Sequence, residues 1–325
     1  YRKAGYDGVV VTDCWAVADN FQDYGHNQYP GDPVGAVSAS VRSGADLECG
    51  NAFGNLVQGV REGRISMEEI DRSARRVMTS RFRLGEMDAP EEVEWSRLQD
   101  TLLACRAHGK LALEMARETM TLLRNDGTLP LRKDMKVAVV GPNAAREKVM
   151  WGNYNGTPPY TVSVLEGIRR KVGPQNVVYF KGCDIAAPLG DDAVSEESET
   201  VCAELLSGVD AVVFVGGISP DLEGEEMKVP YEGFLGGDRT SIELPSPQRE
   251  MIKRLAATGK PVVMVNLSGS AVALKPESEC CNAILQAWYG GQEGGSAVAD
   301  VLFGDYNPAG RLPVTFYASD EDLPD

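Results

Sequence analysis

An aspartate near the start of the chain directly follows a short apolar run and could act as a nucleophile. The run at residues 9–12 (Val-Val-Val-Thr) is typical of a strand buried on both faces of a parallel sheet, and Asp13 stands where it ends. Enzymes with α/β folds place reactive side chains at the carboxyl ends of such strands, where the strand ends converge. An aspartate after a strand is also a common turn former or helix N-cap, so position alone leaves both interpretations open.

A second group of carboxylates follows another apolar run, at residues 211–215. The loop after it starts with two glycines, contains Glu223 and Glu232, and is too long and too rich in glycine and acid to be a mere connection. Such a loop either covers a site or is a solvated surface. Arg239, near its end, either orients one of these carboxylates or offsets their charge.

Two carboxylates on loops at strand ends suit the hydrolysis of a glycosidic bond. This reaction needs one ionised group at the anomeric carbon and one protonated group that helps the alcohol leave. The chain has only two histidines, His26 and His108, which is little material for a His-rich metal site or a Ser-His-Asp triad. The seven cysteines have no metal-type spacing, and we interpret them mostly as small buried apolar residues. We therefore expect neither a metal nor a cofactor.

Two residues close to Asp13 are candidates for sugar binding. Trp15 offers an aromatic face that suits the apolar side of a pyranose, although a packing role fits it equally well. His26 lies in the Asp-, Asn-, Gly- and Pro-rich loop that follows and is either a hydrogen-bond donor to sugar or a structural residue. His108 falls in a helical pattern and is expected to be structural.

The first part of the chain has the pattern of a parallel strand, helix, strand unit. A helix is expected over 33–43, a second short strand over 44–48, and further helices over 53–62 and 66–84, the last with Ser66 as N-cap and Glu69 three residues on. An acidic, aperiodic segment follows. We expect a first domain at 1–88, a linker at 89–106 and a second domain at 107–325.

In the second part, apolar runs alternate with helical patterns. Strands are expected at 120–123, 137–140, 177–180, 211–215, 262–265 and 283–285, and helices at 102–118, 162–171, 196–206, 247–257 and 294–303. This alternation predicts an α/β domain with a mostly parallel sheet. The glycine-rich run 290–295 lacks the Lys-Ser/Thr ending of a nucleotide loop, which favours a tight strand-to-helix turn over phosphate binding.

Charge excludes some classes of partner. The formal net charge of −16 repels phosphate backbones and anionic lipid surfaces, so we expect no nucleic-acid and no membrane partner. A neutral sugar is indifferent to that field. No apolar stretch approaches the roughly 20 residues that a transmembrane helix needs. Two other hypotheses remain open, a carbohydrate-binding chain without activity and a nucleotide-binding module that uses residues 290–295.

Several motifs, in order along the chain, resemble glycoside hydrolase family 3 and its β-xylosidase and α-L-arabinofuranosidase branch. They lie at 5–14 (Gly-Tyr-Asp-Gly-Val-Val-Val-Thr-Asp-Cys), 44–50, 121–131, 139–144, 152–156 (Gly-Asn-Tyr-Asn-Gly) and between Tyr289 and Phe316. The resemblance implies the last strands of a (β/α)8 barrel followed by an α/β sandwich domain. It also implies that Asp13 is the nucleophile and that retaining hydrolysis releases β-D-xylosyl residues from xylo-oligosaccharides, with β-glucosidase activity as the alternative.

The resemblance leaves two choices for the acid/base. Family members of this branch have a Gly-Gly pair followed after a short interval by Glu-x-Glu, and this register selects Glu223. The family's Asp-Arg pair comes later here, at Asp238-Arg239, and a register anchored on it selects Glu232 instead. Cys14 stands where the glucosidase branch usually has Trp, which favours pentosides. The family's six earlier barrel strands have no counterpart here, so a longer chain or a partner chain is expected to supply them, and a periplasmic or secreted location is implied.

Overall fold

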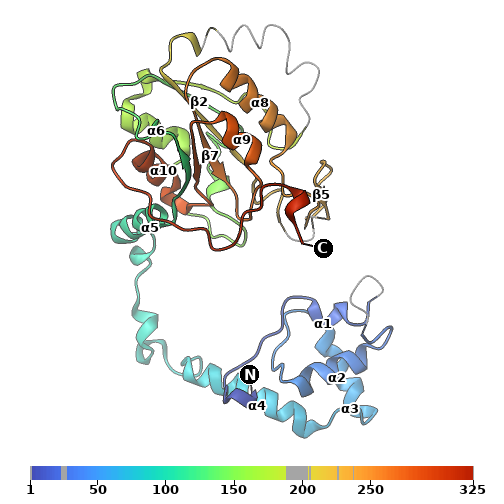
Figure 1. Ribbon diagram of the computed structural model, residues 1–325. Helices are drawn as coiled ribbons and strands as arrows, with labels where there is room; N and C mark the ends of the chain where they lie inside the picture. Colours follow the sequence, from blue (N-terminus) through green and yellow to red (C-terminus); the bar gives the residue numbers. More distant parts are fainter. Residues whose placement is uncertain are drawn as a thin grey trace. The chain divides into compact units, whose positions relative to one another are not determined.

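The computed structural model describes residues 2–22, 28–187, 204, 206–224, 227–236 and 238–324. The chain divides into two compact units, Tyr1–Asp100 and Thr101–Asp325, and each is described by itself (Figure 1). His26 and most of the helix predicted at 196–206 lie outside the described residues.

Unit 1 is built around a parallel pairing of the two segments predicted as strands. They meet in a single parallel bridge, Val11 with Leu47, and helix α2 (Pro33–Ser43) connects them with the predicted bounds. The Asp32 carboxylate caps α2 by accepting from the Gly35 amide at 2.9 Å, and Gly44 ends it at φ 110°. The predicted strands are thus reduced to a bridge, because the amides of Asp46 and Leu47 both donate to the Val10 carbonyl and a regular ladder does not continue.

The remaining elements of unit 1 are helical. They are η1 (Arg2–Ala4), α1 (Ala16–Asp19), η2 (Ala52–Asn55), α3 (Leu56–Arg61) and α4 (Met67–Arg83), followed by the short turns η3 (Pro90–Glu92), η4 (Glu94–Arg97) and η5 (Asp100–Leu102), the last of which crosses into unit 2. The predicted capping box of α4 is present, since Ser66 and Glu69 each bond the other's backbone amide.

A buried carboxylate fixes the strand that leads to Asp13. Asp46 is 7% exposed, accepts from the Val10 amide at 3.0 Å and forms ion pairs with Arg2 and with Arg76 of α4. Burial raises the pKa of Asp46, but the bonds from Val10 and Arg76 outweigh it and hold the pKa below its usual value. The ionised side chain therefore ties both bridging segments to α4.

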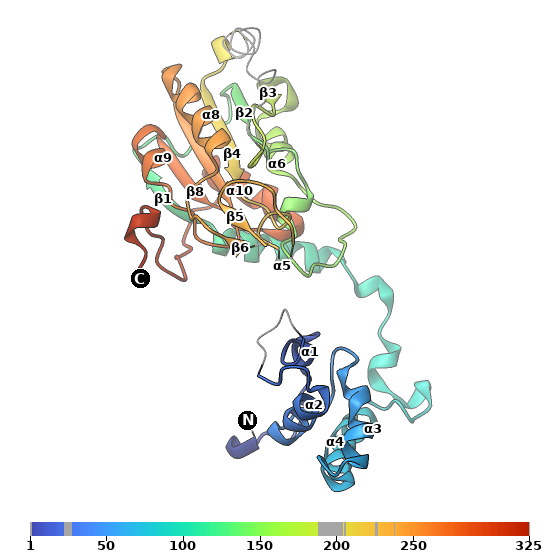
Figure 2. The same cartoon turned by 90° about the vertical axis from the view of Figure 1, so that its right-hand side faces the viewer.

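Unit 2 contains a six-stranded sheet in the order β1-β8-β7-β4-β2-β3 (Figure 2). Its strands are β1 (Thr121–Asn125), β2 (Val137–Val140), β3 (Val177–Phe180), β4 (Ala211–Gly217), β7 (Val262–Leu267) and β8 (Ala283–Gln286). All neighbours pair in parallel except β1, which runs antiparallel to β8. The predicted mostly parallel sheet is confirmed. A separate small hairpin joins β5 (Phe234–Leu235) to β6 (Asp238–Arg239).

Helices cover both faces of the sheet, with α6 and α10 on one face and α8 and α9 on the other (Figure 2). The helices of unit 2 include α5 (Arg106–Thr119), α6 (Val164–Val172), α8 (Ser246–Ala257), α9 (Lys275–Cys280) and α10 (Gly294–Leu302), with turns at η6 (Lys148–Met150), η7 (Pro174–Asn176), η8 (Gly291–Glu293) and η9 (Asp320–Asp322). Alternate residues of β2 enter opposite cores: Val137 and Val139 join one, Ala138 and Val140 the other. This explains why the central strands are continuous apolar runs.

The glycines of residues 290–295 serve helix packing. A β-carbon built on Gly295 would lie 2.1 Å from the Ser163 carbonyl oxygen at the start of α6, and one on Gly167 would lie 2.1 Å from the Gly295 carbonyl oxygen. Only glycines allow this close approach of α6 and α10.

We expect Gly295→Ala to lower the free energy of unfolding by about 1–3 kcal/mol, because backbone must shift to admit the methyl group. Urea unfolding of the variant measures this. Gly208→Ala is the matched control, since a β-carbon there meets nothing within 4 Å. Equal stability of the two variants would show that α10 and α6 tolerate a wider separation.

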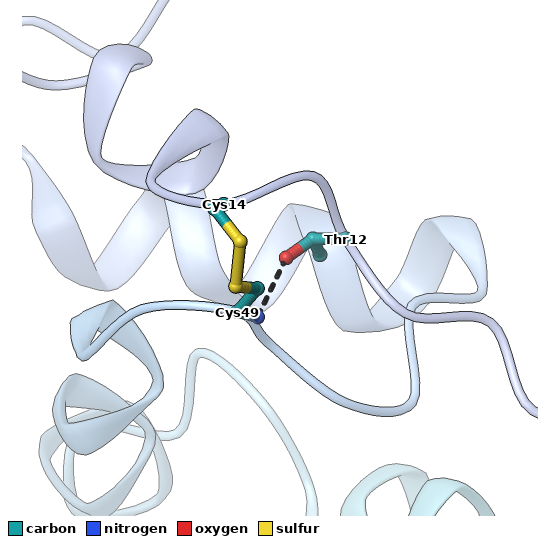
Figure 3. Close-up of a disulfide and its surroundings, with 3 residues drawn as sticks. All are labelled: Thr12, Cys14 and Cys49. Atoms are coloured by element: carbon teal, nitrogen blue, oxygen red, sulfur yellow. Dashed lines mark hydrogen bonds between the residues drawn. A yellow bond between two sulfur atoms is a disulfide. The ribbon is translucent and has the colours of Figure 1, made fainter. Parts of the chain in front are cut away.

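The prediction that the cysteines are mostly small buried apolar residues fails for Cys14 and Cys49. Cys14 and Cys49 form a disulfide (Figure 3), so they are not simply small apolar residues. The parallel bridge between Val11 and Leu47 brings these two segments together, which cysteine spacing alone does not reveal. Of the other described cysteines, Cys183 and Cys281 are buried and Cys105 and Cys280 are partly exposed. No helix within the described ranges is long and apolar enough to cross a membrane.

Candidate functional site

Asp13 lies on an exposed turn that is fixed on both sides. Before it, the Thr12 amide donates to the Leu47 carbonyl at 3.0 Å, and the Thr12 hydroxyl accepts from the Cys49 amide at 3.1 Å. After it comes the Cys14–Cys49 disulfide, shown with Thr12 in Figure 3. The Asp13 side chain is exposed at the carboxyl end of the bridging segment. This is the position that the sequence predicted for a reactive carboxylate.

Trp15 directly precedes helix α1 and is open to solvent. Its side chain is 56% exposed, and its backbone has φ 66°, in the left-handed region that few non-glycine residues adopt. The Trp15 amide donates to the Cys49 carbonyl at 2.7 Å. In unit 1 the ring is therefore not a core residue, and its sugar-binding role stays a prediction. The same role for His26 falls outside the described residues.

Glu223 occupies a polar site at the carboxyl ends of β4, β7 and β8. Its Oε1 accepts from the Gly269 amide at 2.8 Å and from the Tyr289 hydroxyl, and its Oε2 accepts from the Ser270 hydroxyl at 2.6 Å. The loop after β4 supplies Glu223, the loop after β7 supplies Gly269 and Ser270, and Tyr289 follows β8. Since β4, β7 and β8 are neighbouring parallel strands, their carboxyl ends meet at one edge of the sheet.

Buried amides fix the start of the loop after β4. Gln248 of α8 accepts from the Gly217 amide at 2.8 Å and donates to the Gly217 carbonyl at 2.6 Å. Asn143, which follows β2, donates to the carbonyls of Gly216 at 3.2 Å and Ile218 at 3.0 Å. Further along, the Glu223 backbone carbonyl accepts from Asn153 at 3.3 Å. The start of this loop and the Glu223 backbone itself are thus anchored.

Arg239, on β6, supports this site through its neighbours. Its guanidinium donates to the Ala271 carbonyl at 2.7 Å and to the Ser270 hydroxyl at 3.3 Å, and also to the carbonyls of Ser241 and Glu243. Burial lowers the pKa of Arg239, and the charge of Glu223 opposes that shift. Arg239 therefore anchors the loop after β7, whose Gly269 amide and Ser270 hydroxyl donate to Glu223. Its role toward the carboxylate and its contact with sugar stay predictions.

Glu232 lies apart from these contacts. It is exposed, and its carboxylate forms no hydrogen bond or ion pair with a described residue. It lines a cavity of about 450 Å³ with Tyr231, Phe234 and the Glu243–Arg249 ion pair among its walls. The structure thus brings Glu223 and Arg239 together and leaves Glu232 outside that group.

Sequence reasoning missed Ser270 and Tyr289 as partners of Glu223. The Ser-Gly-Ser run after the apolar strand 262–267 was an available signal, since small hydroxyl and glycine residues at a strand end are typical of loops that bind through backbone amides. Burial, the charge of Glu223 and the hydrogen bond to it raise the pKa of the Tyr289 hydroxyl, which therefore remains a donor at neutral pH. Among the described residues, no group of three or more metal-ligating side chains is present.

Comparison with known proteins identifies the family. A family model described as the glycosyl hydrolase family 3 C-terminal domain matches residues 120–325. The chain belongs to glycoside hydrolase family 3. This membership confirms the resemblance noted in the sequence and the predicted fold class, the last barrel strands followed by an α/β sandwich domain with a mostly parallel sheet.

Individual relatives align with nearly the whole of this chain. It is 36% identical to a xylan 1,4-beta-xylosidase of Xylanibacter ruminicola, over 99% of this chain and 53% of the relative. It is 33% identical to a periplasmic beta-glucosidase of Salmonella typhimurium, over 98% of this chain and 43% of the relative. A solved family 3 exo-beta-xylosidase in complex with a xylobiose aziridine probe matches with TM-score 0.78 and 29% identity, over 93% of this chain and 37% of that one. This family 3 chain therefore spans about half the length, or less, of these relatives.

Proposed function

We propose that the full-length protein is a retaining glycoside hydrolase in which Asp13 is the nucleophile and Glu223 the acid/base. Asp13 attacks the anomeric carbon while protonated Glu223 gives its proton to the leaving oxygen, and water then releases the sugar with Glu223 as base. Such a mechanism requires the two carboxyl groups to lie about 5–5.5 Å apart in the working enzyme. The observation that carries the choice of Glu223 is its set of three donors at the strand ends of the sheet.

The two carboxylate oxygens of Glu223 have different hydrogen-bond partners, which suits a group that must both release and take up a proton. Oε1 accepts from an amide that can only donate and from the Tyr289 hydroxyl, so both its lone pairs are engaged. Oε2 meets only the Ser270 hydroxyl, which can donate to a carboxylate and accept from a carboxylic acid. The proton to be transferred is therefore carried on Oε2. Glu232 has no comparable partners among the described residues.

The substrate that we propose is a neutral oligosaccharide with a terminal non-reducing β-D-xylosyl residue. The xylan 1,4-beta-xylosidase relative, at 36% identity, and the solved exo-beta-xylosidase support this choice. So does Cys14, because its disulfide to Cys49 fixes the residue next to Asp13 where the glucosidase branch usually has Trp. The net charge of −16 is compatible with a neutral sugar and unfavourable for nucleic acid.

β-Glucosidase activity is the second candidate, favoured by the periplasmic beta-glucosidase relative at 33% identity. Turnover of aryl β-xyloside and aryl β-glucoside by the full-length protein separates the two. We expect a higher kcat/KM for the xyloside. A higher value for the glucoside would replace the proposed substrate, and no turnover of either, with sugars still raising the Tm, would favour carbohydrate binding without catalysis.

Tyr154 is a further candidate for sugar binding. It is 93% exposed, its φ of 53° is in the left-handed region, and it follows Asn153, which bonds the Glu223 backbone. An exposed ring next in sequence to a residue that bonds the Glu223 backbone suits stacking on the sugar of the leaving group. We expect Tyr154→Ala to raise KM for xylotriose about tenfold, as the loss of one such contact would, and to leave kcat/KM for an aryl xyloside nearly unchanged. Steady-state kinetics on both substrates tests this, and equal losses on both would contradict it.

A further inference from the structure

The Glu223 site contains a hydroxyl whose position links a buried network to the proposed proton donor. Ser270 donates to Glu223 Oε2 at 2.6 Å and accepts from Arg239 at 3.3 Å. A serine hydroxyl has one hydrogen and two lone pairs. Because Arg239 takes one lone pair, the hydroxyl hydrogen is directed to the carboxylate when Glu223 is ionised, and the second lone pair can accept from Glu223 when it is protonated.

The loop that carries Ser270 rests on a buried polar network. Asn266 of β7 donates to Gln286 of β8 at 2.5 Å and to the Ser268 hydroxyl at 3.2 Å, and Gln286 donates to that hydroxyl at 3.0 Å. All three side chains are fully buried. The three bonds among these side chains restrict their arrangement, although Asn266 Oδ1 has no hydrogen-bond partner among the described residues. This network therefore holds the Gly269 amide and the Ser270 hydroxyl where Glu223 meets them.

From this geometry we infer that Ser270 is a positioning residue that sets the acidity of Glu223, with Arg239 acting through it. The Ser270 bond is strongest when Glu223 is ionised, because hydrogen bonds to a charged acceptor are stronger than neutral ones. It therefore favours departure of the proton to the leaving oxygen. The inference rests on the proposed function of Glu223 and adds a residue that family membership does not assign.

Tyr289 bonds Glu223 Oε1, whereas Ser270 bonds Oε2, the oxygen that carries the proton in the proposed mechanism. Its loss weakens the stabilisation of the carboxylate but leaves the contact between Ser270 and Oε2 in place. We therefore expect loss of the Tyr289 hydroxyl to move the alkaline limb of the pH profile in the same direction as loss of the Ser270 hydroxyl. The Ser270 hydroxyl can still donate to the ionised Glu223 and accept from its protonated form.

The test is the pH dependence of kcat/KM for the full-length protein with an aryl β-xyloside whose leaving group needs protonation. Loss of a donor to the ionised form leaves the proton bound to higher pH. We expect Ser270→Ala to move the alkaline limb of the profile upward by about one pH unit, as the loss of one charged hydrogen bond implies, and Ser270→Thr to restore it. The acid limb stays in place because it reports the nucleophile.

Two control variants remove hydroxyl-to-carboxylate hydrogen bonds elsewhere in unit 2. Ser296 donates to Glu293 at 2.7 Å and Tyr306 donates to Glu118, so Ser296→Ala and Tyr306→Phe each lose a hydroxyl–carboxylate contact away from Glu223. Both controls are expected to keep the wild-type profile. An unchanged alkaline limb in Ser270→Ala, together with loss of activity in Glu223→Gln, overturns the inference and leaves the proposed function standing. Retained activity in Glu223→Gln overturns the proposed function itself.

Discussion

Asp13→Asn will reduce kcat/KM of the full-length protein on aryl β-xylosides by about a thousandfold or more, because an amide cannot form the glycosyl ester through which retaining hydrolysis passes. The loss should be the same for good and poor leaving groups, since both need the nucleophile. Steady-state rates with a series of aryl xylosides measure it. If kcat/KM fell only for substrates with poor leaving groups, Asp13 would instead be the proton donor.

Asp13→Asn is expected to fold as the wild type does. 
The turn at Asp13 is fixed by the Thr12 bonds and by the Cys14–Cys49 disulfide, none of which uses the Asp13 side chain. The side chain is exposed, and substitutions at such positions usually change stability by less than about 0.5 kcal/mol. Equal Tm values for wild type and Asp13→Asn are therefore expected. Asp19, an acidic residue of helix α1, gives a control in Asp19→Asn, which should keep full activity.

The second large effect is expected at Glu223 and depends on the leaving group. Removing a general acid costs about 10²–10⁴-fold in rate. We expect Glu223→Ala to lose that much kcat/KM on an alkyl or unactivated aryl xyloside and little on a dinitrophenyl xyloside, whose leaving group needs no proton. Azide, a small anionic nucleophile, should then accelerate release of the glycosyl-enzyme by entering the space left by the carboxylate.

Glu232 provides the matched comparison for that prediction. Glu232→Ala should keep wild-type rates on all these substrates and show no azide effect, since its carboxylate has no described partner and lies outside the Glu223 group. Azide rescue distinguishes a catalytic glutamate from a structural one, because lost packing is not restored by an anion. Rescue of Glu232→Ala, with none for Glu223→Ala, would move the acid/base role to Glu232.

The sequence predicted the sheet of unit 2 more fully than the contacts of unit 1. Strands β2 and β3 have their predicted bounds because alternate residues enter two cores, which requires continuous apolar runs. Helix α2 also has its predicted bounds, between the Asp32 cap and Gly44. The two-residue strands β5 and β6 were missed because they are too short for periodicity to mark them.

The candidate site was predicted only as far as single residues at strand ends. The apolar runs, a local signal, pointed to Asp13 and to the loop that contains Glu223, and the family register selected Glu223 within that loop. Ser270 and Tyr289 were missed because their meeting with Glu223 depends on β7 and β8 lying next to β4, an order that no local pattern contains. The Cys14–Cys49 disulfide was missed for the same reason, since its cysteines are 35 residues apart and meet through a tertiary bridge.

Covalent labelling of the nucleophile is the sharpest test of the role of Asp13. A 2-deoxy-2-fluoro β-xyloside with a good leaving group should inactivate the full-length protein and leave one fluoroxylosyl group, which peptide mapping by mass spectrometry locates. We predict that the label is on the peptide containing Asp13 and that Asp13→Asn takes up none. A label on any other carboxylate, with Asp13 unmodified in the inactivated enzyme, would contradict it.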